Sequence, residues 1–537
     1  MARMDVKLRR LAGVALLLLP LGACGGDGGG AADGGGGTIV VGMRSDFGGF
    51  NPITSDALYS MELMSYALFT PLVQYDENLG VQPWLAESWE EQGDTAVVFQ
   101  LRRDVTWHDG QPVTAEDVKF TFDRAKAPET ASLVGSAFLG EVESAAVIDT
   151  FTIRFDYVRP HAQALEDFWW SPAPKHLLED VAPAELRNAP YNRAPVGSGP
   201  YRLTQWEANR QLVLEPYAGF PEALGGPPAA RRIVFRVIPE ASTMLTELVT
   251  GGVHVDIPVL PDQTAQIEEN SATELYSFPG RTVYFIGWNN RRAPFDDVRV
   301  RRALALALDR QEIIDALLYG QGQIATSTVP PWHPMYPEGV QPLAPDRAEA
   351  ARLLDEAGWR DTNNDGMREK NGRPLRFELL SSDDALRRAV SEVIQAQLRQ
   401  VGVQAEIRVT EFQTMLAAHR ARDFDAIFTN WVLDNFQVAS APYSLMHSEF
   451  ATVENSANRS SVSIPELDAV IESAAGATDE AVARAAWADF TRIVQERQPM
   501  TFMFWLNEVA GVRQEVEGVE MDPRGEFQTI RNWSLGR

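Results

Sequence analysis

The sequence predicts an α/β protein in which strands and helices follow one another along the chain. Ala96–Leu101 places Val97, Phe99 and Leu101 at every second position, as a strand does, and Val300–Leu318 places apolar residues at helical spacing. Residues 386–431 then read as helix, strand, helix and strand. With 537 residues, 45% of them hydrophobic, the chain is long enough for about three domains and has an ordinary globular composition.

In the first half, short local signals mark three elements. Thr38–Met43 is a β-branched run and is the first expected strand. Ala96–Leu101 is another, and Asp109-Gly110 has the signature of a turn. Thr114 is expected to cap a helix, because acidic residues follow it and apolar residues then share one face.

The second half carries the longest periodic segments. Gly320 follows the first of them and Gly402 the second, as expected at helix ends. The expected elements are one helix over Val300–Leu318, a helix over Leu386–Val401, a strand over Val403–Val409, a helix around Phe412, Met415 and Leu416, and a strand over Phe424–Trp431.

Residues 1–23 are predicted to be a signal peptide. A basic head precedes the apolar run Leu11–Leu21, which would span only ~16 Å as a helix and is too short to cross a bilayer. The run ends at Leu21-Gly22-Ala23-Cys24, which resembles a bacterial lipoprotein processing site, so we expect Cys24 to be lipidated. An ordinary secretory signal with an incidental cysteine is the alternative. Residues 24–37 are Gly-rich and predict a flexible tether.

Composition excludes several classes of function. A formal net charge of −26 argues against binding to nucleic acid and against electrostatic adhesion to anionic lipid. Cys24 is the only cysteine, which rules out an intrachain disulfide. Val196–Gly199 lacks the first glycine of a nucleophile elbow, and no zinc-protease or dinucleotide-binding motif is present. We therefore expect no catalytic residue, no metal site and no cofactor.

One segment resembles a calcium-binding loop in its first half only. Asp361–Gly366 has the acidic and amide residues of such a loop, but Gly372 stands where the bidentate glutamate should be. We expect a polar turn here rather than a calcium site.

Several distinctive segments follow one another along nearly the whole mature chain: Gly49-Phe50-Asn51-Pro52, Pro83–Glu90, Leu101–Gly110 with its continuation Val113–Arg124, Gly197-Ser198-Gly199-Pro200-Tyr201, Asn289–Arg310 and Glu356-Ala357-Gly358-Trp359. In their order and spacing they resemble the family 5 solute-binding proteins of ABC importers, which include oligopeptide and dipeptide binders.

The resemblance implies a two-lobed clamp of the periplasmic-binding-protein type with an inserted third subdomain. Lobe 1 would comprise residues 38–55, 186–287 and 501–537, the insert residues 56–185, and lobe 2 residues 288–500. A solute, most simply a peptide, would be enclosed between the lobes without chemical change. The implied protein is a lipid-anchored, extracytoplasmic monomer. It delivers its solute to ABC permease subunits with their ATPases and binds no nucleic acid.

Site residues follow from the same resemblance. Trp431-Val432-Leu433-Asp434 is similar to the W-x-x-D motif, whose aspartate holds a peptide α-ammonium. Asp434 also comes just after an apolar strand, where open α/β sheets bind ligands, although a solvated loop aspartate beside a core tryptophan would look the same. Weaker candidates, for which core packing is the alternative, are Phe47, Phe50, Asn51, Trp288 and Asn289.

Two departures from the family pattern bear on the ligand. Ser381–Asp384 leads into the helix over Leu386–Val401 with no arginine before Arg387, where dipeptide binders carry one for the ligand carboxylate. Phe436-Gln437 also replaces the usual acidic residue and proline. These changes favour oligopeptides over dipeptides and leave oligosaccharides or nickel chelates open. A lipid-anchored hydrolase and a receptor-coupled sensor are the competing functions.

Overall fold

The computed structural model describes residues 37–158, 164–433 and 436–536. The expected signal peptide, Cys24 and all but the last residue of the expected tether lie outside these ranges. Among the described helices, none combines the length and the apolar character that a bilayer crossing requires.

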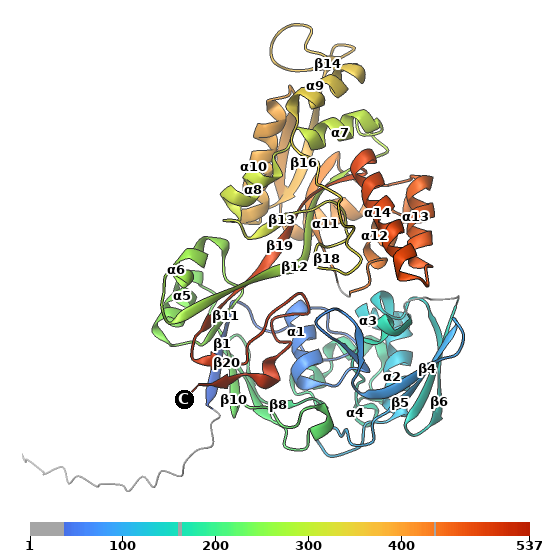
Figure 1. Ribbon diagram of the computed structural model, residues 1–537, viewed down its shortest axis with the longest axis vertical. Helices are drawn as coiled ribbons and strands as arrows, with labels where there is room; N and C mark the ends of the chain where they lie inside the picture. Colours follow the sequence, from blue (N-terminus) through green and yellow to red (C-terminus); the bar gives the residue numbers. More distant parts are fainter. Residues whose placement is uncertain (1–36, 159–163, 434–435, 537) are drawn as a thin grey trace, which may run out of the picture. The chain divides into compact units, whose positions relative to one another are not determined.

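In the described part of the chain, eleven strands join into one large sheet (Figure 1). From one edge to the other, its strands are β17 (Gln404–Thr410), β16 (Arg376–Ser382), β18 (Ala426–Val432), β12 (Thr273–Trp288), β19 (Met500–Arg513), β11 (Val255–Ile257), β1 (Thr38–Met43), β10 (Arg232–Val237), β9 (Gln211–Pro216) and β8 (Tyr201–Glu207), with β13 (Gly322–Ile324) paired to β19.

A separate sheet of four strands has the order β4 (Ala86–Glu91), β5 (Ala96–Leu101), β7 (Thr152–Tyr157) and β6 (Val142–Asp149). The short pairs are β2 (Val73–Tyr75) with β3 (Val81–Pro83), β14 (Glu369–Lys370) with β15 (Arg373–Pro374), and β20 (Val516–Glu517) with β21 (Ser534–Leu535).

The α-helices lie between these strands in the chain. They are α1 (Leu58–Leu63), α2 (Ala115–Lys126), α3 (Leu133–Ala137), α4 (Lys175–Leu178), α5 (Ala241–Thr250), α6 (Thr264–Glu268), α7 (Val298–Leu306), α8 (Arg310–Leu317), α9 (Arg347–Glu356), α10 (Ala385–Arg399), α11 (Phe412–Arg420), α12 (Ser440–Met446), α13 (Pro465–Ala475) and α14 (Glu480–Arg497). A π-helical turn, Met64–Leu68, directly continues α1.

The two longest strands, β12 and β19, connect two groups of strands. They pair antiparallel along most of their length and run side by side in Figure 1. At one end β19 pairs with β11, next to β1, and at the other end β12 pairs with β18. Buried apolar residues form one cluster that contains Val41 and Phe235 and others that contain Trp288 and Trp487. Distinct hydrophobic cores therefore lie on either side of one continuous ribbon.

Most of the expected elements are confirmed. β1 and β5 have the expected bounds, and Thr114 caps α2 by accepting and donating hydrogen bonds in a capping box with Asp117. Helices α10 and α11 and strands β17 and β18 lie within one or two residues of the expected positions.

The single helix expected over Val300–Leu318 is wrong, because the segment forms α7 and α8. Asp309 interrupts it: its side chain accepts the backbone N–H of Glu312 at 3.0 Å and so caps the start of α8. Apolar periodicity continues across the break, which explains why the spacing indicates one helix.

The loop at Asp361–Gly366 is closed by its own polar groups. Asp361 Oδ2 accepts the N–H of Gly366 at 3.0 Å, and Asp365 Oδ1 accepts that of Met367 at 2.8 Å. The acidic side chains thus satisfy backbone donors of the turn. Within the described ranges, no group of three or more His, Cys, Asp or Glu side chains is placed to hold a metal ion.

Candidate functional site

A β-bulge interrupts the ribbon of β12 and β19 near its middle. Pro279 pairs with Asn507 and Thr282 with Leu506, so Gly280 and Arg281 are extra residues on β12. A Cβ on Gly280 would lie 2.6 Å from the Leu506 carbonyl oxygen, so only glycine fits this close approach. Bulges redirect the side chains of a strand, and here the redirected side chain is that of Arg281.

Arg281 forms a buried ion pair with α1. Its Nη2 lies 2.6 Å from Glu62 Oε1, and the two side chains are 5% and 2% exposed. The Arg281 guanidinium also stands over the ring of Phe436, 5.5 Å from its centroid, and its carbonyl accepts the N–H of Leu433 at 2.9 Å. Through these contacts, Arg281 connects α1 with Leu433 and Phe436.

Three glutamates surround this one guanidinium. Glu62 Oε2 accepts the backbone N–H of Glu526 at 3.2 Å, and the two side chains share a further hydrogen bond. Burial raises the pKa of Glu508 to about 8 and that of Glu526 well above its usual value. Burial also raises the pKa of Glu62, against the opposing effect of Arg281. One positive charge does not offset three carboxylates, so the cluster retains protons at neutral pH.

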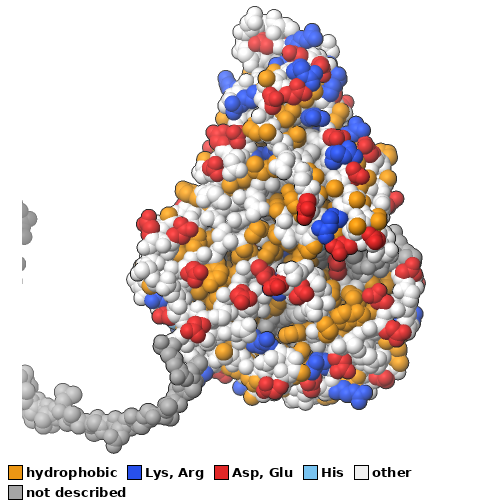
Figure 2. Space-filling view, viewed as in Figure 1, with side chains coloured by type: hydrophobic (Ala, Val, Ile, Leu, Met, Phe, Trp, Pro, Cys, Tyr) orange, Lys and Arg blue, Asp and Glu red, His pale blue; other side chains and the backbone are white. Residues whose placement is uncertain are grey.

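A pocket of about 240 Å³ adjoins the ion pair, and a second of about 250 Å³ adjoins the first. Residues lining the first include Asp56, Met61, Glu62, Trp169, Arg281 and Val432. Those lining the second include Phe412, Met415, Asn430, Trp431, Val432 and Arg459. Val432 lines both, so the two pockets adjoin at the end of β18, and we refer to the pair as the tract. Figure 2 shows hydrophobic side chains gathered over the part of the molecule where Figure 1 labels α1 and α3, and of these two helices α1 lines the first pocket.

Arg459 gives the second pocket a cationic wall. Burial lowers the pKa of Arg459, and the nearby Arg420 and Arg422 add to that effect. Arg387 donates to the side chain of Asn430, which lines the same pocket. Within the described ranges, none of Arg387, Arg422 and Arg459 has a carboxylate oxygen within 4.0 Å. Guanidinium groups without counter-ions favour carboxylates and other planar anions.

A neutral histidine supports this wall. His419 is 6% exposed, and burial together with the neighbouring Arg459 and Arg422 lowers its pKa to about 3. Its uncharged Nδ1 lies 3.4 Å from Arg459 Nη1 and accepts that hydrogen bond. The histidine therefore orients a guanidinium without neutralising it.

Among the described residues, Trp431 is an expected site residue that lines the second pocket, and its contact with a solute remains a prediction. Asp434 lies outside the described residues, two positions beyond the Val432 that joins the pockets. Cys24, expected to carry lipid, also lies outside them.

The candidates near the amino terminus are packed inside the protein. Phe50 is fully buried, with its ring centroid 5.1 Å from that of Trp206 and 5.3 Å from that of Phe47. Asn51 is also fully buried: its Oδ1 accepts the N–H of Ile53 at 3.0 Å, and its Nδ2 donates to Asn192 at 2.9 Å. None of the three lines either pocket of the tract. The structure gives them core and loop-bracing roles, and contact with a solute remains a prediction.

The remaining two candidates are buried as well. Trp288 stacks on Phe295 at 5.0 Å and donates through Nε1 to Thr501 Oγ1 at 3.0 Å. Asn289 donates through Nδ2 to the carbonyl of Phe424 at 3.0 Å. Both side chains are therefore packed in the core, which is the alternative to contact with a solute. Their hydrogen bonds satisfy polar groups that are buried at this end of β12.

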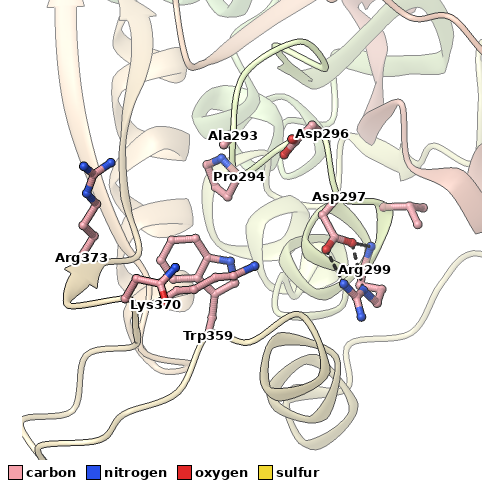
Figure 3. Close-up of a pocket in the computed structure, with 10 residues that line it drawn as sticks. Ala293, Pro294, Asp296, Asp297, Arg299, Trp359, Lys370 and Arg373 are labelled. Carbon is pink, nitrogen blue, oxygen red and sulfur yellow. Dashed lines mark hydrogen bonds and ion pairs between the residues drawn. The ribbon is translucent and has the colours of Figure 1, made fainter.

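A larger pocket, of about 830 Å³, lies elsewhere (Figure 3). Its walls come from the segment before α7, from the end of α9 and from the β14–β15 hairpin, and include Asp297, Arg299, Trp359, Lys370 and Arg373. Asp297 and Arg299 pair with each other at 2.7 Å, and Lys370 donates to the Ala357 carbonyl at 2.8 Å. It shares no lining residue with the tract.

Sequence reasoning missed Glu62, Arg281 and Arg459. For Arg281 a signal existed, since a glycine followed by a charged residue inside an apolar strand indicates a bulge. Glu62 stands on a helix of six residues and Arg459 in a loop, and no local pattern distinguishes either of them.

Comparison with known proteins identifies the family. The model of bacterial extracellular solute-binding proteins, family 5, matches residues 80–452. The chain belongs to this family. It is 27% identical to the oligopeptide-binding protein AppA of Bacillus subtilis over 558 aligned residues, covering 100% of both chains. It is 28% identical to the nickel-binding periplasmic protein of Escherichia coli, covering 84% of this chain and 85% of that protein.

The fold agrees with this membership. The structure of B. subtilis AppA in complex with a nonapeptide superposes with a TM-score of 0.77 at 26% identity, covering 94% of this chain and 99% of that one. The two-lobed α/β clamp expected from sequence is therefore confirmed. Family 5 proteins bind solutes, and the tract between the two groups of strands is the candidate solute site of this chain.

Proposed function

We propose that this protein captures peptides, oligopeptides rather than dipeptides, outside the cytoplasm and delivers them to the permease of an ABC importer. The observation that carries the proposal is the pair of adjoining pockets at the end of β18, of which the second is lined by Arg459, a cation with no carboxylate partner among the described residues. An extended peptide has a free carboxylate that Arg459 can receive and a cationic end that we assign to Asp434, just beyond the same strand. The name and bound nonapeptide of the AppA relative support the same ligand class.

In this proposal Asp434 receives the peptide α-ammonium and Trp431 covers the adjoining residues. Arg459 receives a carboxylate in the second pocket. Phe47, Phe50, Asn51, Trp288 and Asn289 act from the core, by holding the strand ends and loops that frame the tract.

Closure is proposed to pivot on the bulge at Gly280–Arg281, between a first lobe of residues 38–55, 186–287 and 501–537 and a second lobe of residues 288–500. Residues 56–185 are the proposed insert. Solute contacts made only in the closed state would stabilise that state, and no chemical step is needed. We further propose that the protein is a monomer, that lipid on Cys24 anchors it to a membrane, and that it is not an enzyme.

A non-peptide solute is the second candidate, because one relative is a nickel-binding protein. The cationic wall of the second pocket would then receive the anionic groups of a metal chelate.

Mass spectrometry of small molecules that co-purify with the protein tests the proposal most directly. We expect peptides, released intact. Isothermal titration of a recovered peptide should then show at least tenfold weaker binding for Asp434→Ala than for wild type, since a charge-assisted hydrogen bond contributes ~1.5–3 kcal/mol. Recovery of a chelate, or of cleaved peptide, would contradict the proposal. Unchanged binding by Asp434→Ala would remove that residue from the site.

A further inference from the structure

Phe436 packs in a different hydrophobic core from its neighbours in the chain. Leu433 and Val438 belong to the buried cluster that contains Trp487. Phe436 is 2% exposed and belongs instead to the cluster that contains Val41. Its side chain therefore extends from the segment after β18, in the proposed second lobe, into the core on the other side of the ribbon.

The ring of Phe436 contacts two aromatic residues of the proposed insert. Its centroid lies 4.8 Å from that of Tyr75, edge to face, and 5.2 Å from that of Trp169. The indole of Trp169 is fixed in turn, because its Nε1–H donates to Gln74 Oε1 at 3.1 Å. Aromatic pairs at such distances contribute more than the area they bury, so this contact binds the segment to the insert.

The backbone of Phe436 is bound to the proposed second lobe. His333 Nδ1 accepts the N–H of Met335 at 3.0 Å, so the proton of this imidazole is on Nε2, which donates to the Phe436 carbonyl at 3.0 Å. The adjacent Trp332 donates through Nε1 to the Gly280 carbonyl at the bulge, at 3.1 Å. Phe436 is thus held by its carbonyl on one side and by its ring on the other.

The next residue makes a second connection of the same kind. Gln437 donates through Nε2 to Asp167 Oδ1 at 2.5 Å, and Asp167 lies two positions before Trp169 in the proposed insert. Phe436 and Gln437 are also the residues in which this chain departs from the acidic residue and proline of the family pattern. The departure therefore coincides with the contacts between the two cores.

The first pocket of the tract has walls on both sides of these contacts. Trp169 lines it from the proposed insert and Val432 from the end of β18. Because Phe436 follows β18 in the chain and packs on Trp169, its contact keeps the two walls together. All of its partners belong to this chain, so the contact requires no solute.

We propose that Phe436 and Gln437 form a latch that holds the two lobes together and so sets the fraction of the protein that is ready to bind. The affinity that is measured is the intrinsic affinity multiplied by this fraction, so the latch strengthens the binding of every solute by the same factor. The inference rests on the proposed capture of a solute between the lobes and adds to it a contact that favours closure before capture.

Small-angle X-ray scattering without added solute tests the latch. Phe436→Ala should have a larger radius of gyration than wild type, and Gln437→Ala should show a smaller increase, because it removes one hydrogen bond and no ring contact. Phe151→Ala is the matched control, since Arg103 stands over the Phe151 ring at 5.4 Å as Arg281 does over that of Phe436. Phe151 and Arg103 both lie in the proposed insert, so this variant should keep the wild-type radius.

A wild-type radius for a folded Phe436→Ala overturns the proposal. Circular dichroism shows whether the variant folds. If it does not, Phe436→Leu takes its place, because leucine retains an apolar side chain but cannot make the ring contacts. The same increase in radius is then expected, and its absence is equally decisive.

Isothermal titration with two co-purifying peptides of unrelated sequence separates the latch from a direct solute contact. Phe436→Ala should weaken both by the same factor, about tenfold, the size of two aromatic contacts. Weakening of only one peptide would make Phe436 a residue that touches that solute, and the latch would be wrong. If wild type binds no peptide, the proposed function fails, and the scattering comparison alone decides on the latch.

Discussion

The two ends of the pocket tract differ in how their charges are balanced. At the first, three glutamates share Arg281, and the groups are buried against one another. At the second, Arg387, Arg422 and Arg459 have no carboxylate partner among the described residues, and Arg459 faces a pocket. Buried carboxyl groups that share one guanidinium and otherwise retain their protons belong to the folded interior, whereas a cation without a carboxylate partner beside a pocket is available to a ligand. Substitutions at the first end should therefore change stability, and those at the second should change affinity.

The largest effect is expected from Arg281→Leu. Removal of the shared guanidinium leaves Glu62 buried without its partner, which should lower the free energy of unfolding by ~3–5 kcal/mol. Urea unfolding followed by tryptophan fluorescence measures this. Arg492→Leu is the control, because Arg492 forms only exposed ion pairs on α14, and it should cost less than ~1 kcal/mol.

The double variant Glu62→Leu with Arg281→Leu sharpens the interpretation. Because it removes both charges, it should be more stable than Arg281→Leu alone. A loss below ~1 kcal/mol in Arg281→Leu, equal to that of the exposed control, would show that the cluster does not depend on this cation.

Gly280→Ala should have the next largest effect. The new Cβ would meet the Leu506 carbonyl at 2.6 Å, and neither backbone can move without breaking the ribbon, so we expect a loss of ~1–3 kcal/mol. Gly48→Ala is the matched control, since its Cβ would meet only Ala57 at 3.7 Å. Equal unfolding midpoints for the two variants would exclude a special role of the bulge.

At the second end, Arg459→Gln should weaken binding of a peptide with a free carboxylate by about tenfold, or ~1.4 kcal/mol, without a matching loss of stability. The same peptide with a carboxamide end should bind both proteins alike, because it has no charge for Arg459 to receive. Isothermal titration measures both. Arg399→Gln, at the exposed end of α10 and away from the pocket, is the control. An equal loss for both peptide forms would place Arg459 outside carboxylate recognition.

The local elements were predictable because their signals are local. β1, β5 and the capping box of α2 each depend on a few neighbouring residues. The break between α7 and α8 was not predictable, because apolar residues keep their helical spacing across it. The capping preference of Asp309 ends the first helix despite that spacing. The pairing of β12 with β19 joins residues more than two hundred positions apart in the sequence. The spacing of apolar residues in one strand does not indicate which other strand it pairs with, so this pairing was not predictable.

The site was predictable only in part, for a different physical reason. An aromatic residue that packs in a core and one that lines a cleft obey the same hydrophobic pattern, so Phe50 and Trp288 could not be told from Trp431 by sequence. The buried pair of Glu62 and Arg281 depends on a bulge that redirects one side chain across the molecule. The two residues meet only in the folded protein, so no pattern in the sequence indicates that they pair.

A further effect is expected from the pH dependence of the acidic end. Burial raises the pKa of Glu508 to about 8, so between its unfolded value near 4.5 and pH 8 the folded protein holds a proton that the unfolded chain releases. Stability from this group is therefore complete at low pH and is lost as the pH rises through 8, at no more than ~1.4 kcal/mol per pH unit. Thermal unfolding of wild type should shift to lower temperature between pH 6 and pH 9, and Glu508→Gln, which cannot release a proton, should shift less. Glu480→Gln, on the exposed start of α14, should follow wild type. Parallel curves for wild type and Glu508→Gln would mean that this carboxyl is already ionised at pH 6, and the acidic end would then carry more negative charge than Arg281 can balance.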